Sequence, residues 1–358
     1  MDIDNFALSD EQGMILETVR RFVQDEIEPK ALEWDEHGTF VRESFDGLAE
    51  LGMLGISLSE ASGGAEMGLL SFAVAVEEIS QVCGSSARLL LSQTGLCGMA
   101  LEGHAAAKRI AMGESLGAFV GPDSGVTAQP SADGFVLNGA SPMVTAAVEA
   151  DQFVVAATGP EDLKVLCLVA ADVLRREPVP ALGFRASGPG RVSFEDVAVS
   201  ADAVVAQGDA AKAALDRVHV AACIGGGAIG VGLGTASRRL AATYAGERIA
   251  FGKPLTKQQA VALKLADSLR ATEAARHLVY HAARLADAGQ HARTAANMAR
   301  LAAVESAVSA SDDAIQILGG YGFVAEYHVE RFYRDAKTLE VFGGGSEPLR
   351  VELFRYGV

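Results

Sequence analysis

The chain has 358 residues, which is enough to bury a large core and predicts two or three domains. Its formal net charge of −16 argues against nucleic acid or an anionic membrane as a partner, because both attract an excess of Lys and Arg. The four cysteines form no CxxC pair, so the sequence predicts no metal site and no disulfide framework, and reduced thiols in a cytoplasmic protein are expected. The acidic start has the wrong charge for a secretory signal, and the uncharged stretch at 220–234 is too short and too Gly-rich for a bilayer span.

The first third of the chain is predicted to be helical. Ser9, followed three residues later by Gln12, forms a capping box, and the apolar residues after it recur at helical spacing. Pro29 ends or bends this first helix. Further helical patterns, separated by Gly-rich turns, cover 42–51, 69–82 and 87–101.

The pattern changes near Gly117, where short β-rich runs begin to alternate with turn residues. These runs lie at 134–139, 152–156, 165–169 and 191–194. Such a series predicts a small antiparallel sheet domain or barrel.

From Asp209 onward the helical period returns in long Ala-rich segments, at about 211–246, 257–287 and 293–317. Helices, then strands, then helices again predict an α+β fold that is mostly α. We expect an N-terminal helical domain at 1–115, a middle antiparallel β-domain at 116–207 and a C-terminal helical bundle at 208–358.

One Gly-rich segment can be interpreted in two ways. Gly225–Gly230 matches G-x-G-x-x-G, the fingerprint of a dinucleotide-binding loop, and Glu247 lies near the distance at which that fingerprint needs an acid. The bare pattern is weak, and Glu247 does not end a β-branched run. A helix with a small-residue face is the favoured interpretation, and an NAD-dependent dehydrogenase is the alternative.

Three blocks of motifs carry a more specific signal. Residues 316–323 read Gln-Ile-Leu-Gly-Gly-Tyr-Gly-Phe and are followed by Glu326, Arg331 and Arg-Asp-Ala-Lys at 334–337. Residues 248–252 read Arg-Ile-Ala-Phe-Gly, and the first third contains Glu-Trp-Asp, Leu-Ala-Glu-Leu-Gly, Ser-Gly-Gly and Glu-Glu-Ile. In order and spacing these blocks resemble the acyl-CoA dehydrogenase family over roughly residues 8 to 356.

The resemblance implies a C-terminal four-helix bundle, assembly into dimers or tetramers, and FAD bound across a subunit interface. Arg248 can offer a planar fork to phosphate oxygens and Phe251 a flat apolar face. In this chain the residues that the resemblance assigns to FAD are Arg248, Phe251, Gln259, Gln316, Gly319, Gly320, Thr145 and Met143.

The reaction of the family needs a base for the proton next to the thioester, normally a Glu. The resemblance places that base at Gly343 or, as in some relatives, at Ala222, and neither residue accepts a proton. An insertion of one helical turn in the Gly-rich run would move the second position to Val218, with His219 rather than Cys223 at the neighbouring substrate-binding Arg position. Four residues could in principle substitute as a base, and no spacing argument selects one of them: Asp216, His219, Glu340 and Glu347.

The middle domain also departs from the family. The Thr-Glu-x-x-x-Gly-Ser-Asp segment that holds flavin and thioester in relatives is eroded and shortened at 117–128. In the Trp-Ile-Thr stretch, Met143 replaces the aromatic residue that packs on the flavin, while Thr145 is retained.

These departures lead to three hypotheses besides the NAD alternative. In the first, the chain is the base-lacking subunit of a heteromeric acyl-CoA dehydrogenase, with a homologous catalytic subunit as partner in a heterotetramer. In the second, it is a self-sufficient flavoenzyme, a homo-oligomer with a non-standard base. In the third, it is a non-enzymatic scaffold of the same fold.

Overall fold

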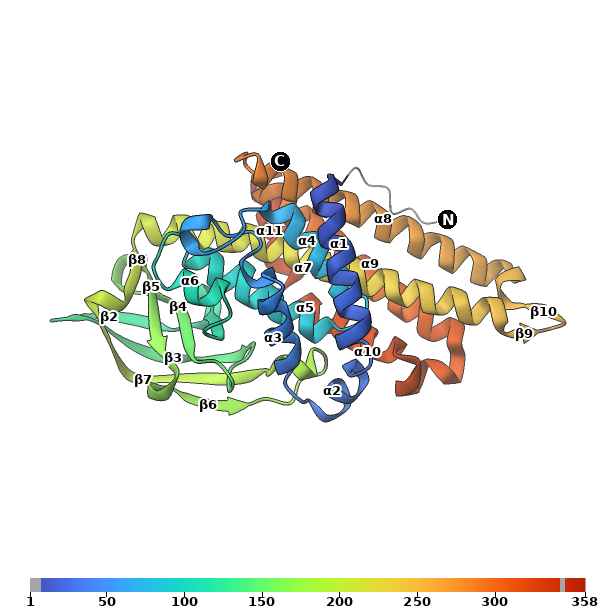
Figure 1. Ribbon diagram of the computed structural model, residues 1–358, viewed down its shortest axis with the longest axis horizontal. Helices are drawn as coiled ribbons and strands as arrows, with labels where there is room; N and C mark the ends of the chain where they lie inside the picture. The colour runs from blue at the N-terminus through green and yellow to red at the C-terminus, as the bar shows by residue number, and fades with distance from the viewer. Residues whose placement is uncertain (1–7, 342–344, 358) are drawn as a thin grey trace.

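The computed structural model describes residues 8–341 and 345–357, and it consists of helices, then a β-sheet, then helices again (Figure 1). The capping box at Ser9 is present, with the Ser9 hydroxyl accepting from the Gln12 N–H at 3.2 Å. The helices of the first third are α1 (Asp10–Phe22), continued by the π-turn η1 (Val23–Ile27), α2 (Ala31–His37), α3 (Arg42–Glu50), α4 (Gly68–Ser80), α5 (Gly84–Leu90), continued by the π-helical η4 (Leu91–Gly98), and α6 (Ala107–Ala111).

The β-sheet has eight strands and forms one end of the molecule in Figure 1. The strands are β1 (Gly117–Val120), β2 (Thr127–Ser131), β3 (Gly134–Val144), β4 (Gln152–Thr158), β5 (Lys164–Ala170), β6 (Arg175–Pro178), β7 (Gly190–Ser200) and β8 (Val204–Gln207). Their order is β6-β7-β3-β2-β4-β5-β8, with β1 also paired to β4. The pairs are antiparallel except β1–β4 and β2–β4, which are parallel. The interior of β4 is buried on both faces, which explains its unbroken apolar run.

The remaining helices pack together beside the sheet. They are α7 (Asp209–Glu247), α8 (Gln259–Asp287), α9 (Arg293–Leu318), α10 (Val329–Val341) and α11 (Ser346–Gly357), with a short hairpin of β9 (Ile249–Ala250) and β10 (Lys253–Pro254) between α7 and α8. Helix α7 contacts α4, α8, α9 and α10, so it runs through the centre of the helical part. The α+β, mostly helical fold predicted from the sequence is thus confirmed. Because β1 begins at Gly117 and α7 begins at Asp209, we propose domain boundaries near 115/116 and 207/208.

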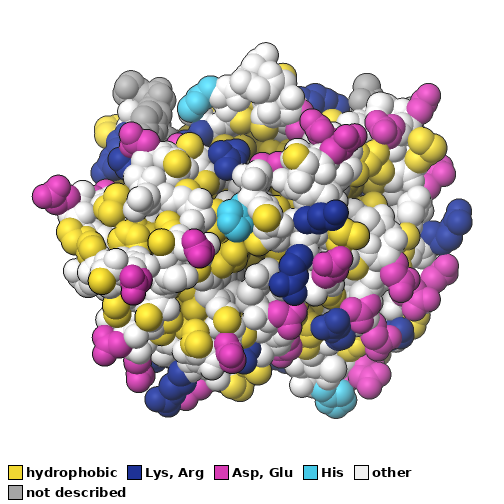
Figure 2. Space-filling view, turned by 60° about the vertical axis from the view of Figure 1, so that its left-hand side comes forward, with side chains coloured by type: hydrophobic (Ala, Val, Ile, Leu, Met, Phe, Trp, Pro, Cys, Tyr) yellow, Lys and Arg dark blue, Asp and Glu magenta, His cyan; other side chains and the backbone are white. Residues whose placement is uncertain are grey.

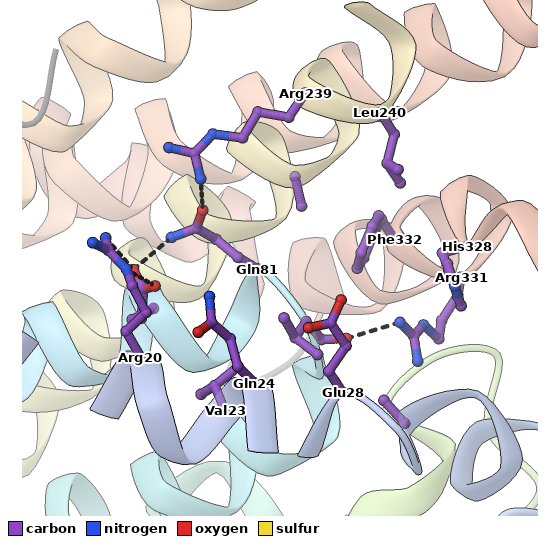
Figure 3. Close-up of a pocket in the computed structure, with 14 residues that line it drawn as sticks. Arg20, Val23, Gln24, Glu28, Gln81, Arg239, Leu240, His328, Arg331 and Phe332 are labelled. Carbon is purple, nitrogen blue, oxygen red and sulfur yellow. Dashed lines mark hydrogen bonds and ion pairs between the residues drawn. The ribbon is translucent and has the colours of Figure 1, made fainter. Parts of the chain in front are cut away.

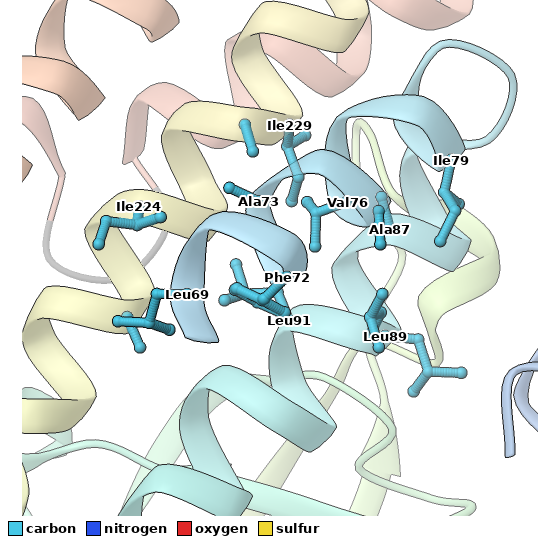
Figure 4. Packing of buried hydrophobic residues seen from close by; sticks show 14 of the residues in the cluster. Leu69, Phe72, Ala73, Val76, Ile79, Ala87, Leu89, Leu91, Ile224 and Ile229 are labelled. Carbon is cyan, nitrogen blue, oxygen red and sulfur yellow. The ribbon is translucent and has the colours of Figure 1, made fainter. Parts of the chain in front are cut away.

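The Gly-rich segment Gly225–Gly230 lies in the middle of α7. A Cβ atom at Gly225 would lie 2.6 Å from Cδ1 of Leu91, and one at Gly230 would lie 2.9 Å from the Ala303 carbonyl oxygen. The small residues therefore let neighbouring helices approach α7 closely, and Figure 4 shows the apolar side chains of α4, α5 and α7 packed at this place. The alternative of a dinucleotide-binding loop is wrong, because the segment is buried helix with no strand before it.

Helix α7 is also the one described helix that is long and apolar enough to cross a bilayer, but 83% of its most apolar window is buried inside the protein. A helix buried to this extent inside the protein is typical of a hydrophobic core. On the face shown in Figure 2, acidic side chains are scattered widely and basic ones stand singly or in small groups, in keeping with the net charge of −16.

Candidate active site

A pocket of about 360 Å³ lies between the β-sheet and helix α7. We call it the sheet–helix pocket. It is lined by Arg88, Leu96, Phe119, Gly121, Pro122, Asp123, Ser124, Ser141, Pro142, Met143, Leu215, Val218, His219, Ala222 and Val341. A concave, mostly apolar wall with a few polar groups is typical of a small-molecule site.

Helix α7 forms one wall of this pocket through Leu215, Val218, His219 and Ala222. These residues recur at three- and four-residue spacing and therefore share one helix face. Both positions that the sequence left open for a base on this helix, Ala222 and Val218, thus face the same pocket. Neither has a side chain that can take a proton. Cys223 is turned into the helical core and is only 1% exposed.

The second expected base position, Gly343, lies outside the described residues. The sequence at 342–344 is Phe-Gly-Gly and contains no carboxylate. Val341, two residues before Gly343, lines the pocket.

Of the described residues that line the pocket, Asp123 is the only one with a carboxylate, and it is solvent-exposed on the turn Pro122–Ser124. The three acidic residues that the sequence offered as substitute bases do not line it. Asp216 accepts from Arg293 Nη1 at 2.8 Å, Glu340 pairs with Lys337, and Glu347 lies 3.5 Å from Arg350. His219 is therefore the one candidate substitute base from the sequence that the structure places at the pocket.

The imidazole of His219 is held on one side by buried polar groups. Its Nε2 atom lies 2.7 Å from Asn297 Oδ1, 3.6 Å from Cys223 Sγ and 4.0 Å from Glu352 Oε2. Burial lowers the pKa of His219, but hydrogen bonds to Cys223 and Asn297 outweigh it and leave the pKa raised. Burial raises the pKa of the Cys223 thiol, and the hydrogen bond to His219 outweighs it and leaves that pKa lowered. Because Nε2 is hydrogen-bonded to these neighbours, Nδ1 is the ring nitrogen that remains to exchange a proton with a bound molecule.

Arg88 was not singled out from the sequence, although a charged residue inside the apolar 87–101 segment is a detectable signal. It lines the pocket, and its Nε donates to Thr145 Oγ1 at 3.1 Å. Burial and the nearby Arg300 lower the pKa of Arg88 to about 9. Thr145 is buried and holds Arg88 through this hydrogen bond, while Met143 lines the pocket itself.

The other residues assigned to FAD lie elsewhere, at the end of the helical part that carries the β9–β10 hairpin (Figure 1). All of them are solvent-exposed, and they are Arg248, Phe251, Gln259, Gln316, Gly319 and Gly320. The Phe251 side chain is 96% exposed and its backbone is left-handed, with a φ of 54°. None of these six residues lines the sheet–helix pocket of their own chain.

Exposed aromatic residues accompany this set. Tyr321 and Phe323 are 48% and 75% exposed, and the rings of Tyr321 and Tyr327 lie 5.0 Å apart. Tyr244 packs edge-on against Tyr321 with centroids 6.1 Å apart. Together with Phe251 these four residues form what we call the aromatic end surface. Exposed apolar surface of this kind marks an interaction site.

Comparison with known proteins agrees with this architecture. Residues 9–110 match the model of the acyl-CoA dehydrogenase N-terminal domain, and residues 211–355 match that of the C-terminal domain. The short-chain-specific acyl-CoA dehydrogenase of Clostridium acetobutylicum is 33% identical over 373 residues, covering 96% of this chain and 97% of that protein. The human mitochondrial short-chain-specific enzyme is 34% identical over 370 residues, covering 96% of this chain and 89% of that protein.

The solved structure of butyryl-CoA dehydrogenase from Megasphaera elsdenii superposes with a TM-score of 0.90 at 29% identity, covering 97% of this chain and 98% of that one. Sequence and fold thus agree over almost the whole length of the chain. The chain belongs to the acyl-CoA dehydrogenase family of FAD-dependent oxidoreductases.

Proposed function

We propose that this chain is the base-lacking subunit of a heteromeric acyl-CoA dehydrogenase, which removes hydrogen from the α and β carbons of an acyl-CoA thioester. The observation that carries the proposal is that Ala222 and Val218 face the sheet–helix pocket where a carboxylate is required. Asp123, the one carboxylate among the described lining residues, is exposed on a turn. Removal of the α-proton needs a positioned base within hydrogen-bond reach.

The residues at the hairpin end fit FAD from outside the subunit. Arg248 can donate to pyrophosphate oxygens, Gln259 and Gln316 offer amide groups, and Phe251 offers a flat apolar face. Because all four side chains are exposed, they suit a cofactor held mainly by a neighbouring subunit. When bound, FAD supplies the acceptor for the hydride that leaves the β-carbon. This chain's own part is to complete that site and to present the aromatic end surface to the homologous catalytic subunit.

Co-expression with dehydrogenase genes encoded beside this one tests the proposal. We expect the chain purified alone to be nearly colourless and inactive on acyl-CoAs, and to co-purify with a homologous subunit as a yellow complex. Sizing chromatography and flavin absorption measure both properties. A chain that is yellow and oxidises acyl-CoAs alone would exclude the heteromeric proposal, and a colourless complex without turnover would favour a scaffold.

A second candidate function, a self-sufficient flavoenzyme, is favoured by the position of His219. Its imidazole lines the sheet–helix pocket and is fixed by Asn297, so Nδ1 could accept the α-proton. In this case a homo-oligomer would turn over acyl-CoA, and His219→Gln would abolish the activity. The pH profile of kcat of the natural protein would then show the ionisation of a single group.

A further inference from the structure

A second pocket, of about 480 Å³, lies in the helical part and shares no lining residue with the sheet–helix pocket. We call it the helical pocket. It lies between α1 with its continuation η1, the end of α4, the C-terminal third of α7, and α10. Val23 and Phe332 give it a buried apolar floor, since they are 2% and 3% exposed. Its volume is within the range of small-molecule sites.

Arg331 lines this pocket and is only 3% exposed. Its Nη2 donates to the Val82 carbonyl oxygen at 2.8 Å, at the end of α4. Its Nε and Nη1 are buried and have no hydrogen-bond partner among the described residues. A buried charged donor without a partner costs free energy, so the site is electrostatically incomplete.

His328, one turn before Arg331, has the same deficiency. It also lines the pocket, and its Nδ1 is buried without a hydrogen-bond partner among the residues that the structure describes. Two side chains from the same segment thus present unsatisfied nitrogen atoms at one pocket. In native proteins most buried polar atoms are satisfied, so such a concentration calls for an explanation.

The other charges of the pocket also favour an anion. Arg20 pairs with Glu78 at 2.8 Å, and Arg239 donates to Gln81 at 2.6 Å, which forms the polar wall in Figure 3. Counting the charged lining residues, Arg20, Arg239 and Arg331 give +3 while Glu28 and Glu78 give −2, which leaves +1. This pocket is positive in a protein whose formal net charge is −16.

The guanidinium of Arg331 keeps a complete fork for a ligand. A guanidinium has two forks, each a pair of parallel N–H groups: Nη2 shares one fork with Nε and the other with Nη1. The Val82 carbonyl oxygen occupies one of them, so the other fork retains both of its donors. Two parallel N–H donors match the two oxygens of a carboxylate, and such charge-assisted pairs are strong.

We propose that the helical pocket binds a small organic carboxylate, with its carboxylate on Arg331 and its apolar part on Val23 and Phe332. Glu28 reaches into the same pocket from η1's end, as Figure 3 shows, and forms no ion pair among the described residues. The Glu28 carboxylate therefore adds a like charge to the pocket and opposes the binding of an anion there. The proposal concerns a site away from the sheet–helix pocket and does not depend on the proposed function.

Calorimetric titration of the full chain with benzoate tests this proposal, with benzamide as the neutral isostere and inorganic phosphate as the competing oxyanion. We expect saturable binding of benzoate, at least tenfold weaker binding of benzamide and phosphate, and at least tenfold loss in Arg331→Gln. Arg331→Lys keeps the positive charge but loses the two parallel donors, and it should lose part of the affinity for benzoate. Comparison of the two variants separates loss of the donors from damage to the end of α4.

Glu28→Gln provides the sharpest comparison, because it is exposed and should leave the fold intact. It is expected to tighten benzoate binding several-fold by removing this like charge. Arg239→Gln, at the pocket wall, should weaken binding less than Arg331→Gln does. Absence of benzoate binding in both the natural chain and Glu28→Gln, or equal affinity in the Arg331 variants, would overturn the proposal. Phosphate binding as tight as benzoate would overturn the carboxylate assignment.

Discussion

The Sγ atom of Cys223 lies 3.6 Å from Nε2 of His219, one helical turn earlier on α7. His219 lies on the face of α7 that lines the sheet–helix pocket, and Cys223 is turned into the helical core behind it. The hydrogen bond shifts the two groups in opposite directions, since the pKa of His219 is raised and that of Cys223 is lowered despite burial. Both shifts favour a thiolate facing an imidazolium.

The Cys223 thiol should therefore titrate below its usual range. His219→Gln should raise the pKa of Cys223, because it removes the larger of the two interactions that oppose burial and leaves only that with Arg300. Thiolate absorption near 240 nm, followed against pH and corrected with Cys223→Ser, measures this. An unchanged titration curve in His219→Gln would show that the pair does not share a proton.

Close packing of α4 on α7 predicts a strong dependence on Gly232. A Cβ atom there would lie 1.9 Å from Ser80 Oγ and 2.5 Å from the Glu77 carbonyl oxygen. We expect Gly232→Ala to lower the free energy of unfolding by roughly 3 kcal/mol or more, as overpacking in a tight core does.

Gly246, near the end of the same helix, is the matched control, because a Cβ atom there would contact nothing within 4 Å. Gly246→Ala should raise the free energy of unfolding by about 0.5–1 kcal/mol through helix propensity. Urea denaturation measures both variants, and similar stabilities for the two would contradict the close helix contact.

The aromatic end surface should act in assembly rather than in folding. Phe251 is 96% exposed, so Phe251→Ala is expected to leave the thermal midpoint of the isolated chain nearly unchanged. In the complex the same change should reduce the flavin content and the yield of the heteromer, which sizing and absorption measure. Val173→Ala, an exposed apolar change in the sheet region, serves as control and should alter neither quantity.

The pH dependence of stability should contain a contribution from Asp335. Burial raises the pKa of Asp335 to about 7 in the folded protein, against 3.8 for the free side chain. The folded state therefore holds this proton more tightly than the unfolded state between those values. Its contribution to stability is present at low pH and is lost as the pH rises toward 7.

Asp335→Asn should remove this dependence while keeping the Oδ1 atom that accepts from the Phe184 N–H. Relative to the natural chain, the variant should gain stability as the pH is raised from 4.5 to 7.5. Parallel denaturation curves over this range measure the difference. A constant difference between the two proteins would show that Asp335 is ionised throughout.

Much of the fold could be predicted from local patterns, although the short helices Ala31–His37 and Ala107–Ala111 were not. The capping box at Ser9 and the small-residue face of α7 are examples, since both depend on interactions close in sequence or on helix geometry alone. The two parallel pairings of β4 could not be read in this way. They join strands far apart in the chain, which no short-range pattern specifies.

For the candidate site, the sequence named some of the residues that line the pocket but not their grouping. It named Met143, Ala222 and His219 separately, and the fold brings them to one pocket. The resemblance assigned Thr145 to the flavin, which stays a prediction, and the sequence did not indicate that the Thr145 hydroxyl accepts from Arg88. It could not foresee that Asn297 and Glu352, from α9 and α11, meet His219, because such contacts depend on how the helices pack.

The proposal that the chain's own pocket lacks a base is tested most directly by exchange of the α-proton of butyryl-CoA in deuterated water, followed by mass spectrometry. We predict no exchange above background with the chain alone, even with FAD added, and rapid exchange with the co-expressed complex. Exchange catalysed by the chain alone, and lost in His219→Gln, would contradict this account and establish His219 as the base.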